Sequence, residues 1–362
     1  MYRPPAHASQ SYRGGESMAT RAGNVVARGG QEAPETVRPT SSEEADAGSA
    51  RGAAMGTGLR ICSLLPSATE IVFALGLGDR LVAVTHECDY PLEATRLPVI
   101  TRSTLDHGMR HSREIHHHIA SALHAGSSIY ALDHALLERL DPTLILTQEL
   151  CDVCAVSYDI VQQAVHRLRG TRTILSLEPT SLGEILRTIQ QVGDAADVAE
   201  TARTLVSTLQ QQVDRIAAEA KSANVQPRVF AMEWLDPPFT AGHWVPEMIR
   251  LAGGRDELAQ AGAPSSQVAW SGIADYDPEI IVLMPCGFSL ERTVEEFTQM
   301  KFPAEWRRLN AVHEGRVYAV NGSAYFNRPG PRIGEGLKIL AEVIHPEIFP
   351  RTTPPQAWRR LG

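Results

Sequence analysis

LRICSLLPSATEIVFALGLGDRLVAVTHECDYP, residues 59–91, reads as a strand, a helix and a second strand in immediate succession. Both strands are short, β-branched and apolar on both faces, which suits parallel strands covered by helices on each side. Ser67 and Glu70 have the spacing of a capping box, for a helix that ends at Gly76 or Gly78. This stretch therefore predicts an α/β fold built on a parallel sheet.

The same alternation of strand and helix continues along the chain. We predict further strands at 97–101, 143–148, 171–177, 228–234, 280–285 and 316–320, and further helices at 112–124, 245–254, 290–300 and 331–344. Ser181 and Glu184 form a second capping box, and Gly193 interrupts the helical pattern that follows. Residues 197–223 then keep helical spacing for about 40 Å at 1.5 Å per residue. Such a helix suits a rigid connection between two lobes.

The domain organisation follows from these elements. We predict two parallel-sheet α/β lobes, 59–178 and 225–348, joined by a linker at 179–224 that contains the long helix. Residues 1–58 are rich in Gly, Ala, Ser, Pro, Arg and Glu without apolar periodicity, which predicts a disordered N-terminal tail. Residues 349–362 are expected to form a C-terminal tail.

Composition excludes several classes of partner. The chain has 362 residues, 43% of them hydrophobic, which is enough for two cores. A net charge of −8 without a basic stripe argues against nucleic acid and anionic membranes as partners. No apolar stretch approaches the roughly 18–20 residues of a membrane span, and no secretory signal is visible. We therefore expect a soluble cytoplasmic protein.

Five apolar runs end in bursts of cysteine, histidine or aromatic residues. In open parallel sheets the ligand lies outside the carboxyl ends of the strands, so we expect these bursts to converge on one site. The runs are LVAVTHECDYP (81–91), TLILTQELCDVC (143–154), RVFAMEWLDPPF (228–239), IIVLMPCGF (280–288) and VYAVNGSAYFNRPGP (317–331).

Aromatic side chains gather in the predicted loops, although aromatics make up only 6% of the chain. Such a group suits a flat, partly apolar ligand. Arg328, beside a proline and a glycine, has a guanidinium that can fork to a carboxylate, phosphate or amide oxygen; the alternative is a salt bridge that stabilises the hinge. The aromatic residues are Tyr90, Trp234, Phe239, Trp244, Trp270, Tyr325 and Phe326.

Cysteine and histidine suggest a second kind of site. The five cysteines are an odd number, which favours free thiols over disulfides. Cys151 and Cys154 form a C-x-x-C pair, which is half of a structural zinc site or a redox dithiol. His86, Cys88 and Cys286 are predicted at the same end of the strands, so the five residues are candidate ligands of zinc or iron. The alternative is that the thiols are simply buried.

Three further observations give no evidence for a functional site. His116, His117 and His118 point about 100° apart on a helix and cannot converge on a metal, so they indicate a solvated helix face. Cys62 lies inside a strand and is expected in the core. The chain contains no G-x-S-x-G, H-E-x-x-H, Walker or G-x-G-x-x-G motif, so nothing indicates an enzyme.

At these loops the chain resembles the two-lobed substrate-binding proteins of iron-siderophore and vitamin B12 ABC importers, most closely the B12-binding type. SLLPSATEIVFALGLGDRLVAVT, CDYP, DPPFTAG, VAW and SAYFNR carry the resemblance, which covers about residues 59–346. It implies two α/β lobes joined by one long helix, with a ligand in the cleft between them. The residues that it places at the ligand are Tyr90, Phe239, Trp270, Tyr325, Phe326 and Arg328. Trp234 is a further ligand candidate as a member of the aromatic group.

The resemblance favours a soluble binding protein for a corrinoid such as cobalamin, in a branch without a signal sequence. His86 or a cysteine is then a candidate ligand of the cobalt. A Cys/His metal or thiol-redox protein using the same cleft, and an iron-siderophore importer protein, are the alternatives. Ala135 stands where importer-docking members carry a glutamate, and the matching glutamate of the second lobe is also absent. These departures argue against docking to an ABC permease.

Overall fold

The computed structural model of the chain divides into two units, Met1–Ala54 and Met55–Gly362, and every residue that it describes lies in the second unit. The predicted N-terminal tail, apart from its last residue, therefore lies outside the described residues, as do Cys151 and Cys154. The described ranges are 58–104, 111–124, 129–148, 161–164 and 172–362.

The first sheet is all parallel, as predicted, in the order β2-β1-β5-β6. Leu144 and Leu146 of β5 face one core and Ile145 faces another, so the sheet is buried on both sides. A two-stranded antiparallel ladder, β3 and β4, lies beside it. The elements are β1 (Ile61–Ser63), α1 (Pro66–Ala74), β2 (Leu81–Ala83), β3 (Thr101–Ser103), α2 (Ser112–His124), β4 (Tyr130–Leu132), α3 (His134–Leu140), β5 (Leu144–Thr147) and β6 (Thr173–Ser176).

The second sheet has the order β11-β10-β9-β7-β8, with a parallel centre and an antiparallel strand at each edge. Helices cover both faces, and each face has its own core. The elements are β7 (Val229–Trp234), β8 (Phe239–Thr240), α7 (Val245–Leu251), α8 (Trp270–Tyr276), β9 (Ile280–Leu283), α9 (Leu290–Gln299), α10 (Asn310–His313), β10 (Val317–Val320), α11 (Gly322–Tyr325), α12 (Ile333–Ile344) and β11 (Trp358–Arg360). Short 3₁₀ turns lie at Gly78–Arg80, Leu92–Arg96 and Trp306–Arg308.

We call the first sheet with α1, α2 and α3 the first lobe, and the second sheet with α7 to α12 the second lobe. Strand β11 falls in the segment that the sequence predicted to be a C-terminal tail, and there the structure differs. Trp358 packs on Tyr318, with ring centroids 5.7 Å apart, and its Nε1 donates to Glu342 at 3.0 Å. One anchored tryptophan thus holds an edge strand that is too short and too basic to show an alternating pattern.

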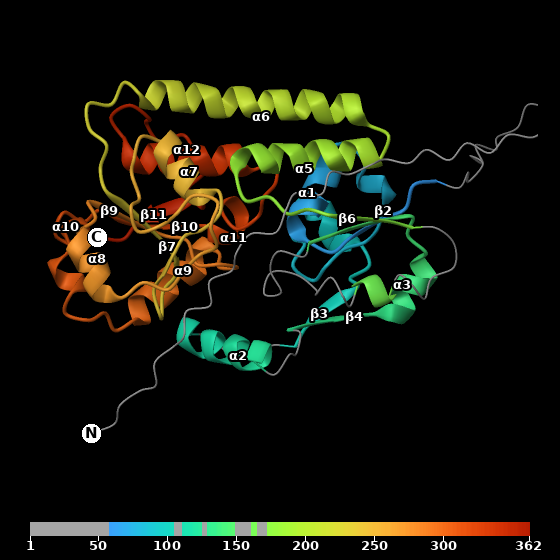
Figure 1. Cartoon of the computed structure of the whole chain (residues 1–362), viewed down its shortest axis with the longest axis horizontal. Coiled ribbons are helices and arrows are strands. Elements are labelled where there is room, and N and C mark those ends of the chain that lie inside the picture. The colour runs from blue at the N-terminus through green and yellow to red at the C-terminus, as the bar shows by residue number, and fades with distance from the viewer. Residues whose placement is uncertain (1–57, 105–110, 125–128, 149–160, 165–171) are drawn as a thin grey trace, which may run out of the picture. The chain divides into compact units, whose positions relative to one another are not determined.

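Two helices connect the cores of the lobes, α5 (Leu182–Ala195) and α6 (Ala199–Ala220) (Figure 1). Leu209 of α6 packs in the core of the first lobe, and Val213 and Ile216 pack in the core of the second. Helix α6 has 22 residues, about 33 Å of helix at 1.5 Å per residue. The helix predicted at 197–223 is therefore shorter than expected. It connects the lobes together with α5, which also contributes to both cores.

Gly193 does not interrupt the helix, contrary to the sequence prediction. Helix α5 passes through it and ends two residues later, before a turn in which Asp197 has φ 58°. A Cβ on Gly193 would lie 2.3 Å from the Cβ of Ala202 in α6. The glycine therefore serves the close approach of α5 and α6 rather than a break between them.

Of the two predicted capping boxes, one is confirmed in its serine and the other is wrong. Ser181 accepts the N–H of Glu184 at 3.3 Å, as a capping serine should, while the Glu184 carboxylate accepts the N–H of Thr180 at 2.7 Å instead of that of Ser181. Helix α1, in contrast, is preceded by Leu65 and begins at Pro66, whose fixed φ suits the first helical position. Ser67 therefore lies inside the helix, and Glu70 turns toward the second lobe. Among the described helices, none has both the length and the apolar character needed to cross a bilayer.

Candidate functional site

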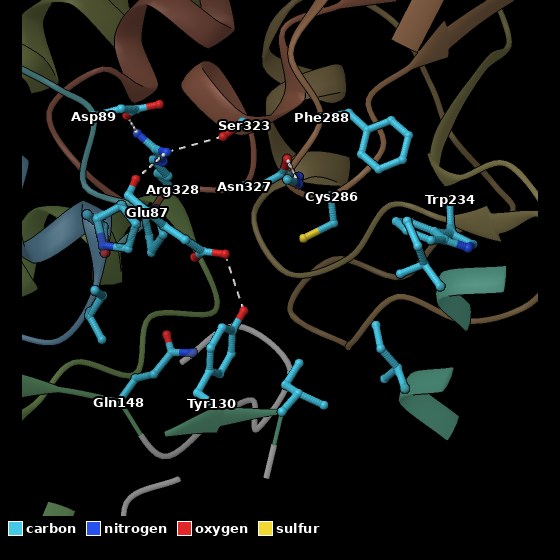
Figure 2. Close-up of a pocket in the computed structure, with 18 of the residues that line it drawn as sticks. Glu87, Asp89, Tyr130, Gln148, Trp234, Cys286, Phe288, Ser323, Asn327 and Arg328 are labelled. Carbon is cyan, nitrogen blue, oxygen red and sulfur yellow. Dashed lines mark hydrogen bonds and ion pairs between the residues drawn. The ribbon is translucent and has the colours of Figure 1, made fainter. Parts of the chain in front are cut away.

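A cavity of about 390 Å³ lies between the two lobes. The first lobe supplies the segments that follow β1, β2 and β5, together with α2 and the start of β4, and the second lobe supplies the last residue of β7 and the segments that follow β9 and β10 (Figure 2). The carboxyl ends of the parallel strands thus meet at one place, as the strand-end bursts predicted.

Aromatic and apolar side chains form part of the wall. Trp234 is the last residue of β7, and its ring meets that of Phe288 at 5.5 Å between centroids. Ile115 and Ile119 of α2 line the cavity from the first lobe. Tyr130 lines it as well (Figure 2). The cavity therefore offers ring faces from both lobes.

Glu87 and Tyr130 form a polar pair in the cavity wall. The Tyr130 hydroxyl donates to Glu87 Oε1 at 3.3 Å. Loss of bulk water around the carboxyl raises the pKa of Glu87, and Arg328 and the Tyr130 bond oppose that rise. His86 stands behind the pair: its ring lies 5.5 Å from that of Tyr130, and its Nδ1 lies 2.8 Å from Thr101 Oγ1.

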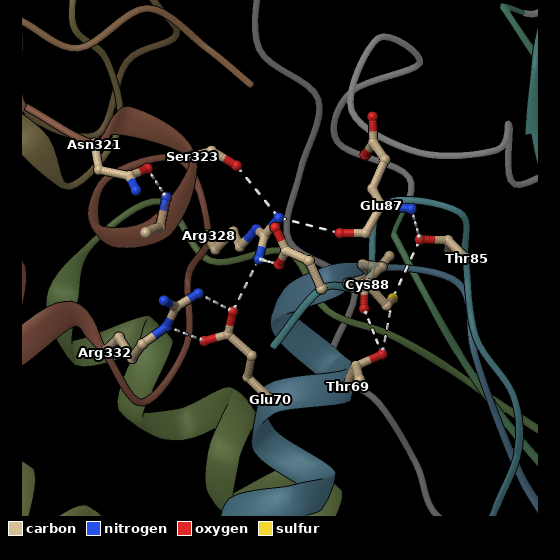
Figure 3. A network of polar contacts seen from close by, with 12 residues as sticks. Thr69, Glu70, Thr85, Glu87, Cys88, Asn321, Ser323, Arg328 and Arg332 are labelled. Atoms are coloured by element: carbon tan, nitrogen blue, oxygen red, sulfur yellow. Dashed lines mark hydrogen bonds and ion pairs between the residues drawn. The ribbon is translucent and has the colours of Figure 1, made fainter. Parts of the chain in front are cut away.

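Arg328 lines the cavity, but its guanidinium is committed to the protein (Figure 3). It donates to Glu70 Oε1 at 3.3 Å, to the Glu87 carbonyl at 3.1 Å, to Ser323 Oγ at 3.2 Å and to the Asp89 carboxylate. Its side chain is only 9% exposed. Burial alone would lower the pKa of Arg328, but Asp89 and Glu70 outweigh it and raise that pKa. Of the two roles considered for Arg328, the structure shows the salt bridge between lobes.

Arg332 completes this junction. Its Nε donates to Glu70 Oε2 at 2.8 Å and its Nη2 donates to Oε1, so Glu70 receives a two-pronged bond (Figure 3). The rings of Tyr90 and Tyr325 lie 4.1 and 5.6 Å from the Arg332 guanidinium carbon. These two tyrosines, which the resemblance placed at the ligand, pack on Arg332 instead of lining the cavity.

Three other predicted ligand residues also lie off the cavity wall. Trp270 begins α8 and packs edge-on against Phe302 and Trp306, each at 6.0 Å. Phe326 is 1% exposed in the core of the second lobe, so the prediction of ligand contact for it is wrong. Phe239 meets His116 of α2 at 5.7 Å.

Trp244 is also buried, and its Nε1 donates to the Phe326 carbonyl at 3.0 Å. Large aromatics in these short helices and loops complete the cores, because the elements are too small to cover the sheet with aliphatic side chains alone.

The described thiols do not form a metal site. Cys88 is buried with its sulfur 3.1 Å from Thr69 Oγ1 and 3.2 Å from Thr85 Oγ1, and burial raises the pKa of its thiol. Cys62 lies in the core, as predicted. Cys286 lines the cavity. Within the described ranges no three His, Cys, Asp or Glu side chains are placed to hold a metal ion, so His86, Cys88 and Cys286 do not form a site by themselves. The other two members of the predicted set, Cys151 and Cys154, lie outside the described residues.

Of the lining residues, the sequence selected Trp234, Cys286 and Arg328 and missed the others. Phe288 and Glu87 stand inside two of the quoted strand-end runs, so the topological argument that selected Cys286 and His86 also applied to them. Tyr130 begins β4 and Arg292 lies in the first turn of α9, and the sequence did not place either element at the cavity.

Helix α2 belongs to the first lobe but is fastened to the second at its N-terminus. Ser112 donates its backbone N–H to Glu296 Oε1 of α9 at 2.8 Å, and its hydroxyl donates to the same oxygen. Trp234 Nε1 donates to the Ser112 carbonyl at 3.2 Å, and Arg113 pairs with Asp236 at 2.7 Å. These contacts hold Ile115 and Ile119 in place as one wall of the cavity.

Comparison with known proteins gives a consistent picture. Residues 137–324 match the family model described as periplasmic binding protein. An uncharacterized ABC transporter substrate-binding lipoprotein of Bacillus subtilis, YvrC, is 27% identical over 295 residues, which is 80% of this chain and 81% of that protein. A vitamin B12-binding protein of Vibrio cholerae is 25% identical over 277 residues, 75% of this chain and 84% of that protein.

Solved structures share the fold. The periplasmic vitamin B12-binding protein BtuF of Vibrio cholerae superimposes with a TM-score of 0.58 at 23% identity, over 81% of this chain and 98% of that one. The periplasmic heme-binding protein RhuT of Roseiflexus sp. RS-1 gives 0.60 at 20% identity, over 80% and 99%. The prediction of a cytoplasmic protein is contradicted by these matches, because the relatives are lipoproteins or periplasmic proteins, which act outside the cytoplasmic membrane.

Proposed function

This chain belongs to the periplasmic binding protein family, and on that premise we propose that it captures a tetrapyrrole metal chelate, a corrinoid in the first place, between its two lobes. Its relatives are substrate-binding proteins of transporters and not enzymes. The class to which it belongs serves ABC importers of vitamin B12, heme and iron complexes.

The observation that supports the proposal is the composition of the interlobe cavity. Trp234 from the second lobe and Tyr130 from the first line it with their rings, Phe288 backs this wall as a nearly buried ring, and Glu87 and Gln148 add hydrogen-bonding groups. A flat macrocycle with polar groups on its edge complements such a wall, because its faces pack on rings while its edge meets polar side chains. The Vibrio cholerae relative named above as a vitamin B12-binding protein makes cobalamin the first ligand to test.

The volume of the cavity determines whether it must widen to admit the ligand. At about 390 Å³ the cavity lies near the lower end of the roughly 300–1,000 Å³ that pockets for drug-sized ligands occupy. A corrinoid with its nucleotide tail is larger than a drug-sized molecule, and heme is smaller than a corrinoid. Binding of a corrinoid therefore requires the cavity to widen, at the contacts of α2 or at the arginine junction, whereas heme requires less.

The test is titration of the purified protein with cyanocobalamin and, separately, with hemin, followed by visible absorbance and calorimetry. We expect a band shift and binding at micromolar concentration or tighter with at least one of them. Absence of both signals for both ligands would refute the proposal.

A pair of variants then locates the site. Phe288→Leu removes a ring from the cavity wall and is expected to weaken binding by about 3- to 10-fold, as loss of an aromatic pair does. Tyr90→Leu removes a ring that lies outside the cavity and is expected to leave affinity unchanged. The reverse ranking would favour the ligand positions implied by family resemblance over the cavity described above.

A further inference from the structure

The two arginines of the cavity wall differ in how their charges are neutralised. Arg328 has Glu70 and Asp89 as ion-pair partners. Arg292, in the first turn of α9, has none: among the residues that the structure describes, its guanidinium forms no ion pair and no side-chain hydrogen bond. Its one close contact is the ring of Phe288, with the guanidinium carbon 4.0 Å from the ring centroid.

Arg292 is partly buried beside the cavity. Burial lowers the pKa of Arg292, while Glu296 and Glu295 on the same helix oppose that change. An arginine stays charged under such conditions. Its nitrogens are not among the buried polar atoms that lack a partner in the described residues, so water reaches them, and an anion would replace that water with a charge-assisted hydrogen bond.

Two neighbouring features determine how the Arg292 guanidinium is placed and how positive its surroundings are. Packing on Phe288 holds the guanidinium against one wall, so that its edge is free to donate. Arg292 also lies at the N-terminal end of a ten-residue helix, where the helix dipole adds positive potential. The second lobe thus presents a positive, ring-backed wall to the cavity, whereas the first lobe presents Glu87 and Tyr130.

We propose that Arg292 determines the specificity of the cavity, and that the ligand carries an anionic group, a carboxylate or a phosphate, that pairs with it. This rests on the proposed function, since it narrows the tetrapyrrole class to members with an acidic edge group. Arg328 does not compete for this group, because its donors are already taken by the protein.

The experiment compares ligands with and without the anionic group on the same ring; in the corrinoid pair the phosphodiester is lost together with the rest of the nucleotide, so the Arg292 variants assign the difference to the charge. One arm measures affinity for hemin, with its two free propionates, and for hemin dimethyl ester. The other arm measures affinity for cyanocobalamin, which contains a phosphodiester, and for dicyanocobinamide, which lacks it. We expect the wild type to prefer the acidic form about 10-fold or more in one arm, as one charge-assisted hydrogen bond predicts.

Three variants assign the preference to Arg292. Arg292→Gln is expected to remove it, and Arg292→Lys to keep part of it, because the charge remains without the planar fork. Arg308→Gln, at an exposed arginine outside the cavity, should retain the full preference. The lysine variant also guards against a glutamine variant that fails to fold.

The outcomes separate the two proposals. Equal binding of acidic and neutral forms by the wild type would overturn the role of Arg292 and leave tetrapyrrole capture standing. If Arg292→Gln kept the preference for the acidic form, the role of Arg292 would likewise be overturned and tetrapyrrole capture would stand. No binding of any of the four probes would overturn both proposals.

Discussion

Glu70 is a carboxylate of the first lobe that is only 2% exposed in its side chain, and its two partners, Arg328 and Arg332, come from the second lobe. Desolvating a carboxylate costs several kcal/mol, roughly, and here the cost is offset by three hydrogen bonds from two guanidinium groups. Removing the carboxylate charge would leave Asp89, which is 67% exposed, as the one remaining ion-pair partner of these two nearly buried cations among the described residues. The stability of the lobe junction therefore depends on this residue.

We predict that Glu70→Gln lowers the free energy of unfolding by about 3–5 kcal/mol, the range for breaking a buried ion pair from one side. Urea unfolding measured by circular dichroism gives this quantity. Glu93→Gln, at an exposed glutamate of the same lobe, is the control and should change stability by less than about 0.5 kcal/mol. Equal effects of the two substitutions would show that the junction does not hold the lobes together.

At the scale of elements, α2 is the part of the cavity wall whose position depends most on the other lobe. Glu296 of α9 accepts both the N–H and the hydroxyl of Ser112, so it acts as the cap of a helix in a different lobe. Glu296 is buried, whereas the preceding Glu295 is exposed. Two adjacent glutamates of one helix thus provide a matched comparison.

Glu296→Gln should loosen the N-terminal turn of α2, because a neutral amide is a weaker acceptor and brings donors of its own. With about 0.5–2 kcal/mol for a lost cap, amide hydrogen exchange in α2 is expected to accelerate about 2- to 30-fold. Mass spectrometry of peptides from α2 measures this without any ligand. Glu295→Gln should leave the exchange unchanged, and acceleration in both variants would contradict the capping role.

Most regular elements could be predicted from the sequence, and the reasons are local. The bounds of α2 agree with the predicted helix at 112–124, and the runs 143–148 and 280–285 contain β5 and β9. These elements carry their own signal, a 3.6-residue apolar period or a fully apolar run. Strand β11 carries none, because its place at the sheet edge depends on Trp358 meeting Tyr318 and Glu342.

The site could be predicted only in part. Strand-end topology located the cavity and selected Trp234, Cys286 and Arg328 among its lining residues. It could not tell that Tyr90 packs on Arg332 or that Phe326 enters the core, because both depend on contacts between distant segments. The ion pairing of the two arginines could not be predicted either. Arg292 and Arg328 look alike in sequence, and only the contacts in the described residues show that Arg328 has ion-pair partners and Arg292 has none.

At the scale of the whole second unit, the same two helices, α5 and α6, contribute apolar side chains to the cores of both lobes. Leu182 and Ile185 of α5 lie in the core of the second lobe, while Leu186 and Ile189 lie in that of the first, and α6 repeats the arrangement. Large hinge motions need loop or terminal residues that absorb changes in φ and ψ. Two helices embedded in both cores offer few such residues.

We therefore predict that ligand binding changes the dimensions of the molecule little. Small-angle scattering curves recorded with and without a saturating ligand, cyanocobalamin or hemin according to which binds, should nearly superimpose. A clear decrease in the radius of gyration on binding would mean that α5 and α6 bend or part, against the packing seen at Gly193 and Ala202.

The bond between Glu70 and Arg332 also constrains the order in which the chain folds during synthesis. The two residues are 262 positions apart, so the ribosome completes the first lobe long before the partner of its carboxylate exists. Domains of a nascent chain generally fold in order from the N-terminus. The first lobe must accordingly keep Glu70 hydrated on an unfinished surface, and water leaves that surface only when the segment that carries Arg328 and Arg332 has been synthesised.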